Sequence, residues 1–439
     1  MYGTTRNETS RLPNEVWVLV AASFIIAIGF GIVAPVLPAY AASFNVGTTA
    51  VSVVVSAFAL VRLAFAPVSG RLVGRLGESR VYVIGILIVA LGTGACGFAT
   101  SYWQLVVFRS LAGVGSTMFT VAAVGLLIRL TPPPLRGRAS GLWATGFLLG
   151  NIAGPIVGAG LVEVSIKAPF LAYAASLVIA AAVVWFFLRR STLATLDVTR
   201  DQVTITVRTA IRSRAYRAAL ASGFANGWAV FGVRISLIPL FVTQALHRGP
   251  GFAGVSLSVF AVGNAAVLMV SGKLSDSRGR KPLALVGLAV SAAGTIWLGF
   301  STDVVIFLAA SLVAGMGAGL LNPAQNAVVA DVIGAKAKGG PVLAGFQMVT
   351  DLGAIIGPLL AGLLADRFSY QVAFTVTGVT LAIAFVAWLF APETLPKQTT
   401  TEPERHVAEG AAGECGCLDE GPELPLGERV AGPPRHPEA

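Results

Sequence analysis

Four ionisable side chains lie deep inside long apolar segments of this sequence. They are Arg62, Arg109, Arg234 and Asp351. A charge at the centre of a lipid bilayer is costly, so such residues usually face a water-filled cavity or one another. Asp351 is the one acid deep within any of these segments. We interpret it either as a group that binds and releases a proton or as the acid of a permanent ion pair with an arginine.

Two of the arginines are candidates for contact with a substrate. Arg62 lies about two helical turns from one end of its segment, so its guanidinium can face the interior or reach the membrane surface. Arg234 follows Asn226 by two helical turns, which predicts that both project from one helix face. Three arginines against one aspartate favour neutral, zwitterionic or anionic substrates over cationic ones.

Further polar and aromatic side chains can line the same cavity. Asn322, Gln325 and Asn326 share one helix face by their spacing, and Gln347, Phe30, Phe119 and Phe231 complete the expected lining. The alternative for each polar residue is a hydrogen bond that holds two helices together.

No pattern in the sequence predicts a cofactor or a metal. Cys415 and Cys417 form a C-x-C pair, but no cluster of His or Cys accompanies it. Motifs for ATP binding, zinc proteases and hydrolytic nucleophiles are also absent from the sequence. We therefore expect no cofactor, no metal and no enzymatic activity.

The composition identifies the elements that must position these residues. The 439-residue chain is 55% hydrophobic and only 12% charged, whereas soluble proteins are about 25% charged. Its apolar runs reach the roughly 20 residues that span a bilayer. We predict an all-α integral membrane protein with twelve transmembrane helices near residues 16–40, 49–69, 81–99, 103–129, 139–162, 168–189, 216–244, 252–271, 282–300, 303–330, 341–365 and 370–390.

Basic residues concentrate in every second loop. The first such loop holds Arg71, Arg75 and Arg80, whereas the loops opposite hold only Lys167, Arg248 and Arg367. Because positive loops stay in the cytoplasm, both termini are expected there, and the net charge of +10 does not indicate nucleic-acid binding. We expect a cytoplasmic N-terminus (1–15), six-helix bundles at 16–189 and 216–390, a cytoplasmic linker (190–215) and a disordered acidic tail (391–439).

The two bundles repeat one another in sequence. GRLVGRLGESR at 70–80 recurs as GKLSDSRGRKP at 272–282, 202 positions later, and the pair Gly154-Pro155 recurs 203 positions later as Gly357-Pro358. Halves with internal symmetry are typical of transporters that expose one central site to each side in turn. The residues of the two charged loops that we expect to act in gating are Gly70, Arg71, Arg75, Gly77, Arg80, Gly272, Asp276, Arg278, Gly279 and Arg280.

At these residues the chain resembles the major facilitator superfamily, and within it the twelve-helix drug:proton antiporters. The loops follow the family signature G-x-L-a-D-r-x-G-r-[kr], except that Gly74 replaces the first Asp, and Arg109 begins R-x-x-x-G-x-G. The segment GNIAGPIVGAG resembles the antiporter motif through Gly150, Gly154, Pro155, Gly158 and Gly160. The resemblance implies that Arg109 lines the cavity and influences proton coupling, and that the loops clamp neighbouring helices.

The resemblance implies a function as well as a fold. We expect a monomeric, proton-coupled exporter of small amphiphilic compounds in the plasma membrane of a bacterium, with an importer or uniporter on the same fold as the alternative. Its expected partners are a small-molecule substrate, protons and the lipid bilayer.

Overall fold

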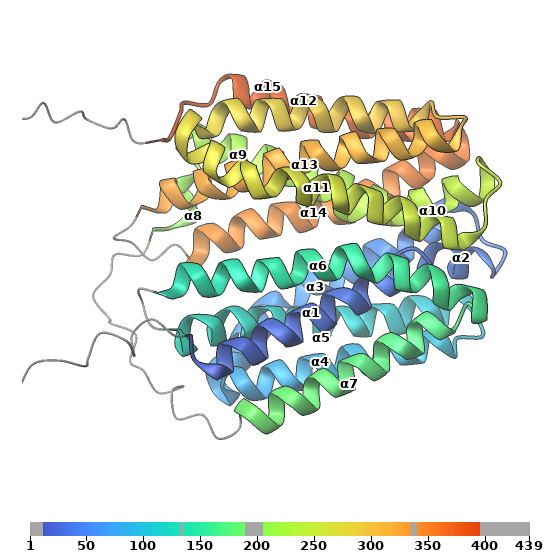
Figure 1. The fold of residues 1–439 in the computed structure, drawn as a ribbon, viewed down its shortest axis with the longest axis horizontal. Helices are drawn as coiled ribbons and strands as arrows, with labels where there is room; N and C mark the ends of the chain where they lie inside the picture. The colour runs from blue at the N-terminus through green and yellow to red at the C-terminus, as the bar shows by residue number, and fades with distance from the viewer. Residues whose placement is uncertain (1–11, 132–134, 189–204, 335–339, 396–439) are drawn as a thin grey trace, which may run out of the picture. The chain divides into compact units, whose positions relative to one another are not determined.

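The computed structural model describes residues 12–131, 135–188, 205–334 and 340–395. Within these ranges the chain is helical and contains no β-strand, and twelve helical spans are long and apolar enough to cross a membrane. The predicted all-α membrane fold is therefore confirmed (Figure 1). Residues 396–439 of the expected tail and most of the linker lie outside the described residues, whereas residues 391–395, which we predicted to be disordered, are described and form hydrogen bonds.

The first half contains seven helices. They are α1 (Asn14–Val33), α2 (Leu37–Ala42), α3 (Thr48–Leu76), α4 (Glu78–Gly97), α5 (Tyr102–Leu130), α6 (Arg136–Val164) and α7 (Ala168–Leu188). The second half begins with the short α8 (Val207–Ala210) and continues with α9 (Arg214–Asn226), the π-helix η4 (Gly227–Val233), α10 (Arg234–Gln244), α11 (Pro250–Arg278), α12 (Arg280–Gly299), α13 (Val304–Ile333), α14 (Gly340–Arg367) and α15 (Tyr370–Leu389).

Two predicted spans differ from single α-helices. The first is interrupted between α1 and α2, where Pro35 and Pro38 cannot donate backbone hydrogen bonds. The seventh consists of α9, η4 and α10 in succession. The π-helix packs closely on α14, because a Cβ at Gly227 would overlap the Thr350 carbonyl and one at Gly232 would overlap Pro358. A π-helical turn inside a span often marks a functional site.

The sequence repeat is also a repeat in packing. In the first half α4 packs along α5, where a Cβ at Gly115 would overlap the Gly85 carbonyl. In the second half α12 packs along α13, and a Cβ at Gly317 would come within 2.8 Å of the Gly287 carbonyl. Gly287 follows Gly85, and Gly317 follows Gly115, by 202 positions in each case. The two halves therefore bring their helices together at equivalent glycines.

The two halves are joined at one end of the bundle. We call the end where α1 begins and α15 ends the terminal end, and the opposite one the far end; they lie left and right in Figure 1. At the far end the Asp366 carboxylate accepts hydrogen bonds from the backbone N–H groups of Thr48 (3.0 Å) and Thr49 (2.7 Å).

Two further hydrogen bonds join the halves deeper in the bundle. The Ser56 hydroxyl donates to the Ile355 carbonyl (2.8 Å), and the Ser258 hydroxyl donates to the Ile152 carbonyl (3.1 Å).

At the terminal end, the glycines of the first charged loop and the start of α14 are exposed. A Cβ placed at Gly70, Gly74, Gly77 or Gly272 would meet no atom within 4 Å, and Leu343 and Met348 near the start of α14 are exposed. Because the hydrogen bonds between the halves described above lie at the far end and farther in, we interpret this conformation as closed at the far end and open at the terminal end.

The two charged loops form the tight turns that their glycines predict. Gly77 joins α3 to α4 with φ of 81°, and Gly279 joins α11 to α12 with φ of 105°. Glycine adopts this left-handed conformation readily, whereas other residues are strained there. Arg71, Arg75 and Arg80 are exposed, as is Arg278, and the Asp276 side chain lies outside the described part of the structure.

An ion pair follows each turn, with its charges reversed between the halves. Glu78 Oε1 lies 2.9 Å from Arg129 Nε, whereas Arg280 Nε lies 2.7 Å from Asp331 Oδ2. Arg280 follows Glu78, and Asp331 follows Arg129, by 202 positions in both cases. The repeat therefore retains the pair and its location and exchanges the acid and the base.

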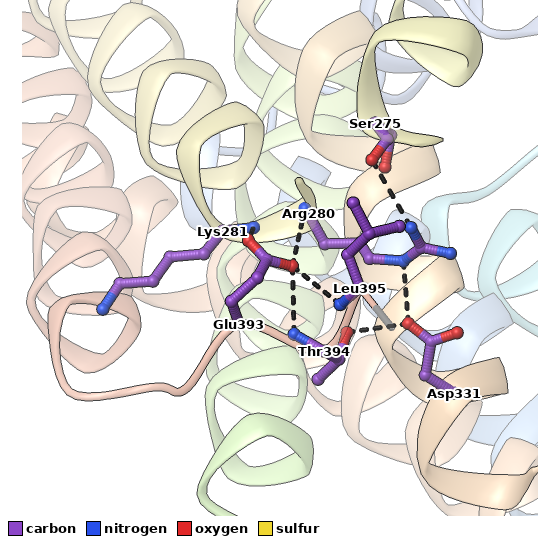
Figure 2. Close-up of polar contacts among 7 residues, drawn as sticks. All are labelled: Ser275, Arg280, Lys281, Asp331, Glu393, Thr394 and Leu395. Atoms are coloured by element: carbon purple, nitrogen blue, oxygen red, sulfur yellow. Dashed lines mark hydrogen bonds and ion pairs between the residues drawn. The ribbon is translucent and has the colours of Figure 1, made fainter. Parts of the chain in front are cut away.

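In the second half, the chain after α15 joins this ion pair (Figure 2). The Glu393 carboxylate accepts from the backbone N–H groups of Arg280 (2.9 Å) and Lys281 (3.0 Å), and the Thr394 hydroxyl donates to Asp331 Oδ2 (2.7 Å). Burial raises the pKa of Glu393, but backbone N–H groups that include those of Leu395 and Arg280 outweigh it and hold the pKa below its ordinary value. Glu393 thus supplies a negative charge at the N-terminus of α12, where Arg280 alone would be unfavourable.

Candidate substrate and proton site

Two adjoining cavities of about 200 Å³ each lie between the halves. Phe30, Phe231 and Ile235 line both of them, so the two form lobes of one site. We call them the Asp351 lobe and the Arg234 lobe after the charged residue that each contains.

The Asp351 lobe brings together six of the predicted site residues, of which Phe30 and Phe231 are aromatic and four are polar or charged. Arg62, Arg109, Gln347 and Asp351 all line it. Gln347 Nε2 donates a hydrogen bond to Asp351 Oδ1 at 3.1 Å. Among the described residues Asp351 forms no ion pair, so the permanent pair considered from the sequence is not present in this conformation. Its carboxylate therefore faces the cavity without a fixed cationic partner.

The arginines of this lobe are arranged around an aromatic ring. The Arg109 guanidinium carbon lies 4.2 Å from the centroid of Phe58, and that of Arg62 lies 5.9 Å from the same ring. Only 5% of Arg109 is exposed. Gly113, one turn after Arg109, permits this approach, since a Cβ there would come within 2.7 Å of the Phe58 carbonyl oxygen. The lobe thus contains two cations and one carboxylate.

The Arg234 lobe contains a cation but no acid. Asn151, Asn264 and Asn322 provide its other polar side chains, and the remaining lining is apolar. The Arg234 guanidinium carbon lies 3.7 Å from the centroid of Phe260. Phe260 follows Phe58 by 202 positions, so the halves share the aromatic ring but receive their arginines from different helices, α5 and α10.

A small amide network lies behind this lobe. Asn322 Oδ1 accepts hydrogen bonds from Asn226 Nδ2 (3.3 Å) and from Gln325 Nε2 (3.0 Å). Asn226 and Gln325 are buried and line neither lobe, whereas Asn326 is exposed. The bond from Asn226 on α9 joins two helices, as the alternative interpretation of the amides predicts, whereas the bond from Gln325 lies within α13.

Phe119 also lies outside the two lobes. It is buried in the core of the first half, where its ring meets the edge of Tyr82 at a centroid distance of 6.3 Å. We expected Phe119 to line the cavity, but its side chain faces α4 instead.

The glycine motif of α6 fits α6 closely against α1. A Cβ at Gly150 would come within 2.8 Å of the Ile28 nitrogen, and a Cβ at Gly154 or Gly158 would overlap the carbonyl of Ile28 or Ile32. Gly160, by contrast, has no atom within 4 Å of its Cβ position, and Pro155 lines the Arg234 lobe. Three of the four motif glycines are thus required for the α1–α6 contact.

Sequence reasoning missed several residues that shape the site. Phe58, Phe260 and Asn264 line it, and Glu78 and Asp331 stabilise the terminal-end turns. The spacing of 202 positions could have identified Phe58 and Phe260, because they recur in the same register as the charged loops. Within the described residues, no group of His, Cys, Asp and Glu side chains could hold a metal ion.

Comparisons with known proteins identify the family and the fold. The sequence profile of the Major Facilitator Superfamily matches residues 19–237 and 219–429. The chain is 24% identical over 384 residues to the multidrug efflux protein YfmO of Bacillus subtilis (strain 168), an alignment that covers 86% of this chain and 93% of YfmO. It is 27% identical over 356 residues to the class H tetracycline resistance protein of Pasteurella multocida, covering 79% of this chain and 87% of that protein.

A solved structure has the same fold. A bacterial homologue of the human lysosomal transporter Spinster, in an inward-facing and unoccupied conformation, superposes with a TM-score of 0.72 at 16% identity, over 88% of this chain and 98% of that one. Because the profile covers both halves and the fold agrees, this chain belongs to the Major Facilitator Superfamily and is a membrane transporter of small molecules, not an enzyme.

Proposed function

We propose that the protein exports small amphiphilic compounds from a bacterial cell in exchange for protons, and that it does so as a monomer in the plasma membrane. The relatives named for multidrug efflux and tetracycline resistance support the export of drugs or of chemically similar metabolites.

The positions of the exposed arginines support an orientation with the terminal end in the cytoplasm. The exposed arginines Arg71, Arg75, Arg80 and Arg278 lie at the terminal end, and positive loops stay on the cytoplasmic side. With the terminal end in the cytoplasm, the described conformation opens inward and is ready to take up a substrate for export.

The observation that carries proton coupling is the position of Asp351. It lines the cavity, is held by Gln347 and has no fixed ion pair among the described residues. Protonation of Asp351 would change the charge of a lobe that also contains Arg62 and Arg109. A ligand shifts the equilibrium between the inward-open and outward-open states only if it binds one of them more tightly. A proton on Asp351 meets this condition if the charge balance of the lobe differs between the two states.

The experiment uses inside-out membrane vesicles with an acidic lumen and a pH-sensitive dye trapped inside. Ethidium, tetracycline and 2-naphthoate are added as cationic, zwitterionic and anionic probes. For an exporter, an accepted probe enters the lumen and protons leave it, so the lumenal pH rises. We expect this response from the wild type and its loss in Asp351→Asn, with uptake of the probe itself followed in parallel.

Asp303→Asn is the matched control. Asp303 caps α13 at the far end through the backbone N–H of Val305, and Asn caps helices about equally well, so transport should be unchanged. Proton release by both Asp351→Asn and the wild type would remove Asp351 from coupling. Movement of probe and protons in the same direction would replace the exporter with the importer.

A further inference from the structure

Arg234 is a buried cation whose hydrogen-bond donors are not all used. It is 7% exposed, and its Nε and Nη1 atoms are buried without a hydrogen-bond partner among the described residues. No Asp or Glu lines its lobe. A buried charge without a partner is strongly destabilising, so proteins usually provide one. Here the empty space beside the guanidinium is the cavity.

The contact with Phe260 does not replace such a partner. The guanidinium carbon lies over the ring, 3.7 Å from its centroid, and the ring stabilises the positive charge there. The N–H donors of arginine point outward in the plane of the group, in a fork that matches a carboxylate. Phe260 therefore holds the guanidinium in place and leaves these donors to a ligand.

The neighbouring amides add donors. Asn322 Oδ1 already accepts two hydrogen bonds, from Asn226 and Gln325, which leaves its Nδ2 group to donate toward the lobe. The Asn264 amide has no side-chain hydrogen bond to any described residue. A cation with amide donors is a site for a negatively charged group.

The rest of the lobe is suited to an apolar body. Phe30, Phe231 and Ile235 separate it from the Asp351 lobe, and Leu148 and Leu257 line it farther on. The arrangement of one charged subsite in an aromatic and aliphatic cavity fits an amphiphilic molecule with a single anionic head.

We propose that Arg234 binds the anionic head, a carboxylate or sulfonate, of an amphiphilic substrate, with the apolar body against Phe30 and Phe231. As a transport site this rests on the proposed export function, but binding itself does not depend on it. The membrane potential, inside negative, then contributes directly, because an anion that leaves the cell moves in the direction that this potential favours.

The test measures binding to the purified full chain in nanodiscs of phosphatidylcholine. Radiolabelled 2-naphthoate is compared with 2-naphthamide, which has the same ring system and no charge. We expect the wild type to bind the carboxylate at least about tenfold more tightly than the amide, since hydrogen bonds to charged groups are the stronger ones. Arg234→Gln should abolish this preference and leave the affinity for the amide within about twofold.

Asp303→Asn, the far-end control, lines neither lobe and should retain the preference for the carboxylate. The vesicle experiment separates this proposal from proton coupling. If Asp351→Asn still releases protons in vesicles while Arg234→Gln loses naphthoate binding, the coupling proposal fails and the anion site stands.

Three results would overturn the anion site. One is equal affinity of the wild type for the two probes, which can be measured even if Arg234→Gln does not fold. Another is an unchanged preference in Arg234→Gln. The third is loss of naphthoate binding when phosphatidylglycerol replaces phosphatidylcholine, which would assign the subsite to a lipid headgroup.

Discussion

The Asp366 carboxylate at the end of α14 caps the first turn of α3 in the opposite half through Thr49. Its Oδ2 accepts from both the backbone N–H (2.7 Å) and the hydroxyl (2.6 Å) of Thr49. Glu163, 203 positions earlier in the repeat, occupies the equivalent place at the end of α6, where its Oε1 lies 3.1 Å from the Cβ position of Gly251 on α11. Each half thus directs a carboxylate to the positive N-terminus of a helix in the other.

Removal of the Asp366 charge should weaken closure of the far end. We expect Asp366→Asn to shift the equilibrium toward the state closed at the terminal end by about 1 kcal/mol, or roughly fivefold, because the bond is charge-assisted but exposed. Spin labels on cysteines at Arg75 and Leu343, in a background without the three native cysteines, report the change as a larger population of short distances.

The control for Asp366→Asn is again Asp303→Asn, which changes a far-end acid that caps a helix of its own half. It should leave the distance distribution unaltered. If the two variants give the same distribution, Asp366 does not stabilise the described conformation. The double variant Asp366→Asn/Glu163→Gln should shift the equilibrium further than either single change, because the two contacts share no residue.

The reversed ion pairs predict an asymmetric response to charge changes. Glu78→Gln removes the carboxylate that Arg129 Nε binds, and we expect a loss of about 1 kcal/mol of stability because the pair is partly exposed. The swap Glu78→Arg/Arg129→Glu should restore the pair but not all the stability, since the start of α4 then carries a cation at the positive end of the helix dipole.

A double-mutant cycle measured by thermal unfolding in detergent checks this expectation. The reciprocal swap Arg280→Glu/Asp331→Arg is the companion experiment, in which Glu393 would face the new acid at the start of α12. A coupling free energy of zero between positions 78 and 129 would show that the ion pair does not stabilise the fold.

The α6 glycines predict a position-specific effect of one methyl group. Gly154→Ala would overlap the Ile28 carbonyl and come within 2.7 Å of Gly31 Cα, so we expect a loss of roughly 1–3 kcal/mol and a fall in transport. Gly160→Ala meets no atom within 4 Å and should be neutral or slightly stabilising in a helix. Equal melting temperatures for the two variants would contradict the close α1–α6 contact.

Much of this fold could be predicted from the sequence because the bilayer imposes simple requirements. The twelve spans follow from apolar length, and the turns at Gly77 and Gly279 follow from a repeated glycine in a short charged loop. The meeting of Arg62, Arg109 and Asp351 in one lobe was foreseeable in part, since buried charges of opposite sign tend to share a cavity.

Other features depend on geometry that spacing does not determine. The π-helix before Arg234 packs on α14, and Phe119 faces the core although we expected it to line the cavity. The bond from Asp366 to Thr49 joins residues more than 300 positions apart and belongs to one conformation of the carrier. Periodicity within a helix indicates which side chains share a face, but not which face meets the other half.

The final prediction concerns pH and Glu393. Its carboxylate binds the backbone N–H groups of Arg280, Lys281 and Leu395, and its pKa lies below the ordinary value of 4.5. A group with a lower pKa in the folded state stabilises the fold at pH values above its unfolded pKa and loses this contribution as the pH falls through the folded pKa. We therefore expect Glu393→Gln to be less stable than the wild type at neutral pH, by about 0.5–1 kcal/mol for an exposed charge at a helix N-terminus. The difference should begin to shrink near pH 4.5 and vanish below it, in thermal unfolding of the two proteins from pH 7 to pH 3.5.

The control for this pH dependence is Ser369→Ala. It removes an uncharged cap from α15, so its effect on stability should not follow the titration of Glu393. A Glu393→Gln effect that stays constant or grows on acidification would mean that the charge of Glu393 does not stabilise the start of α12.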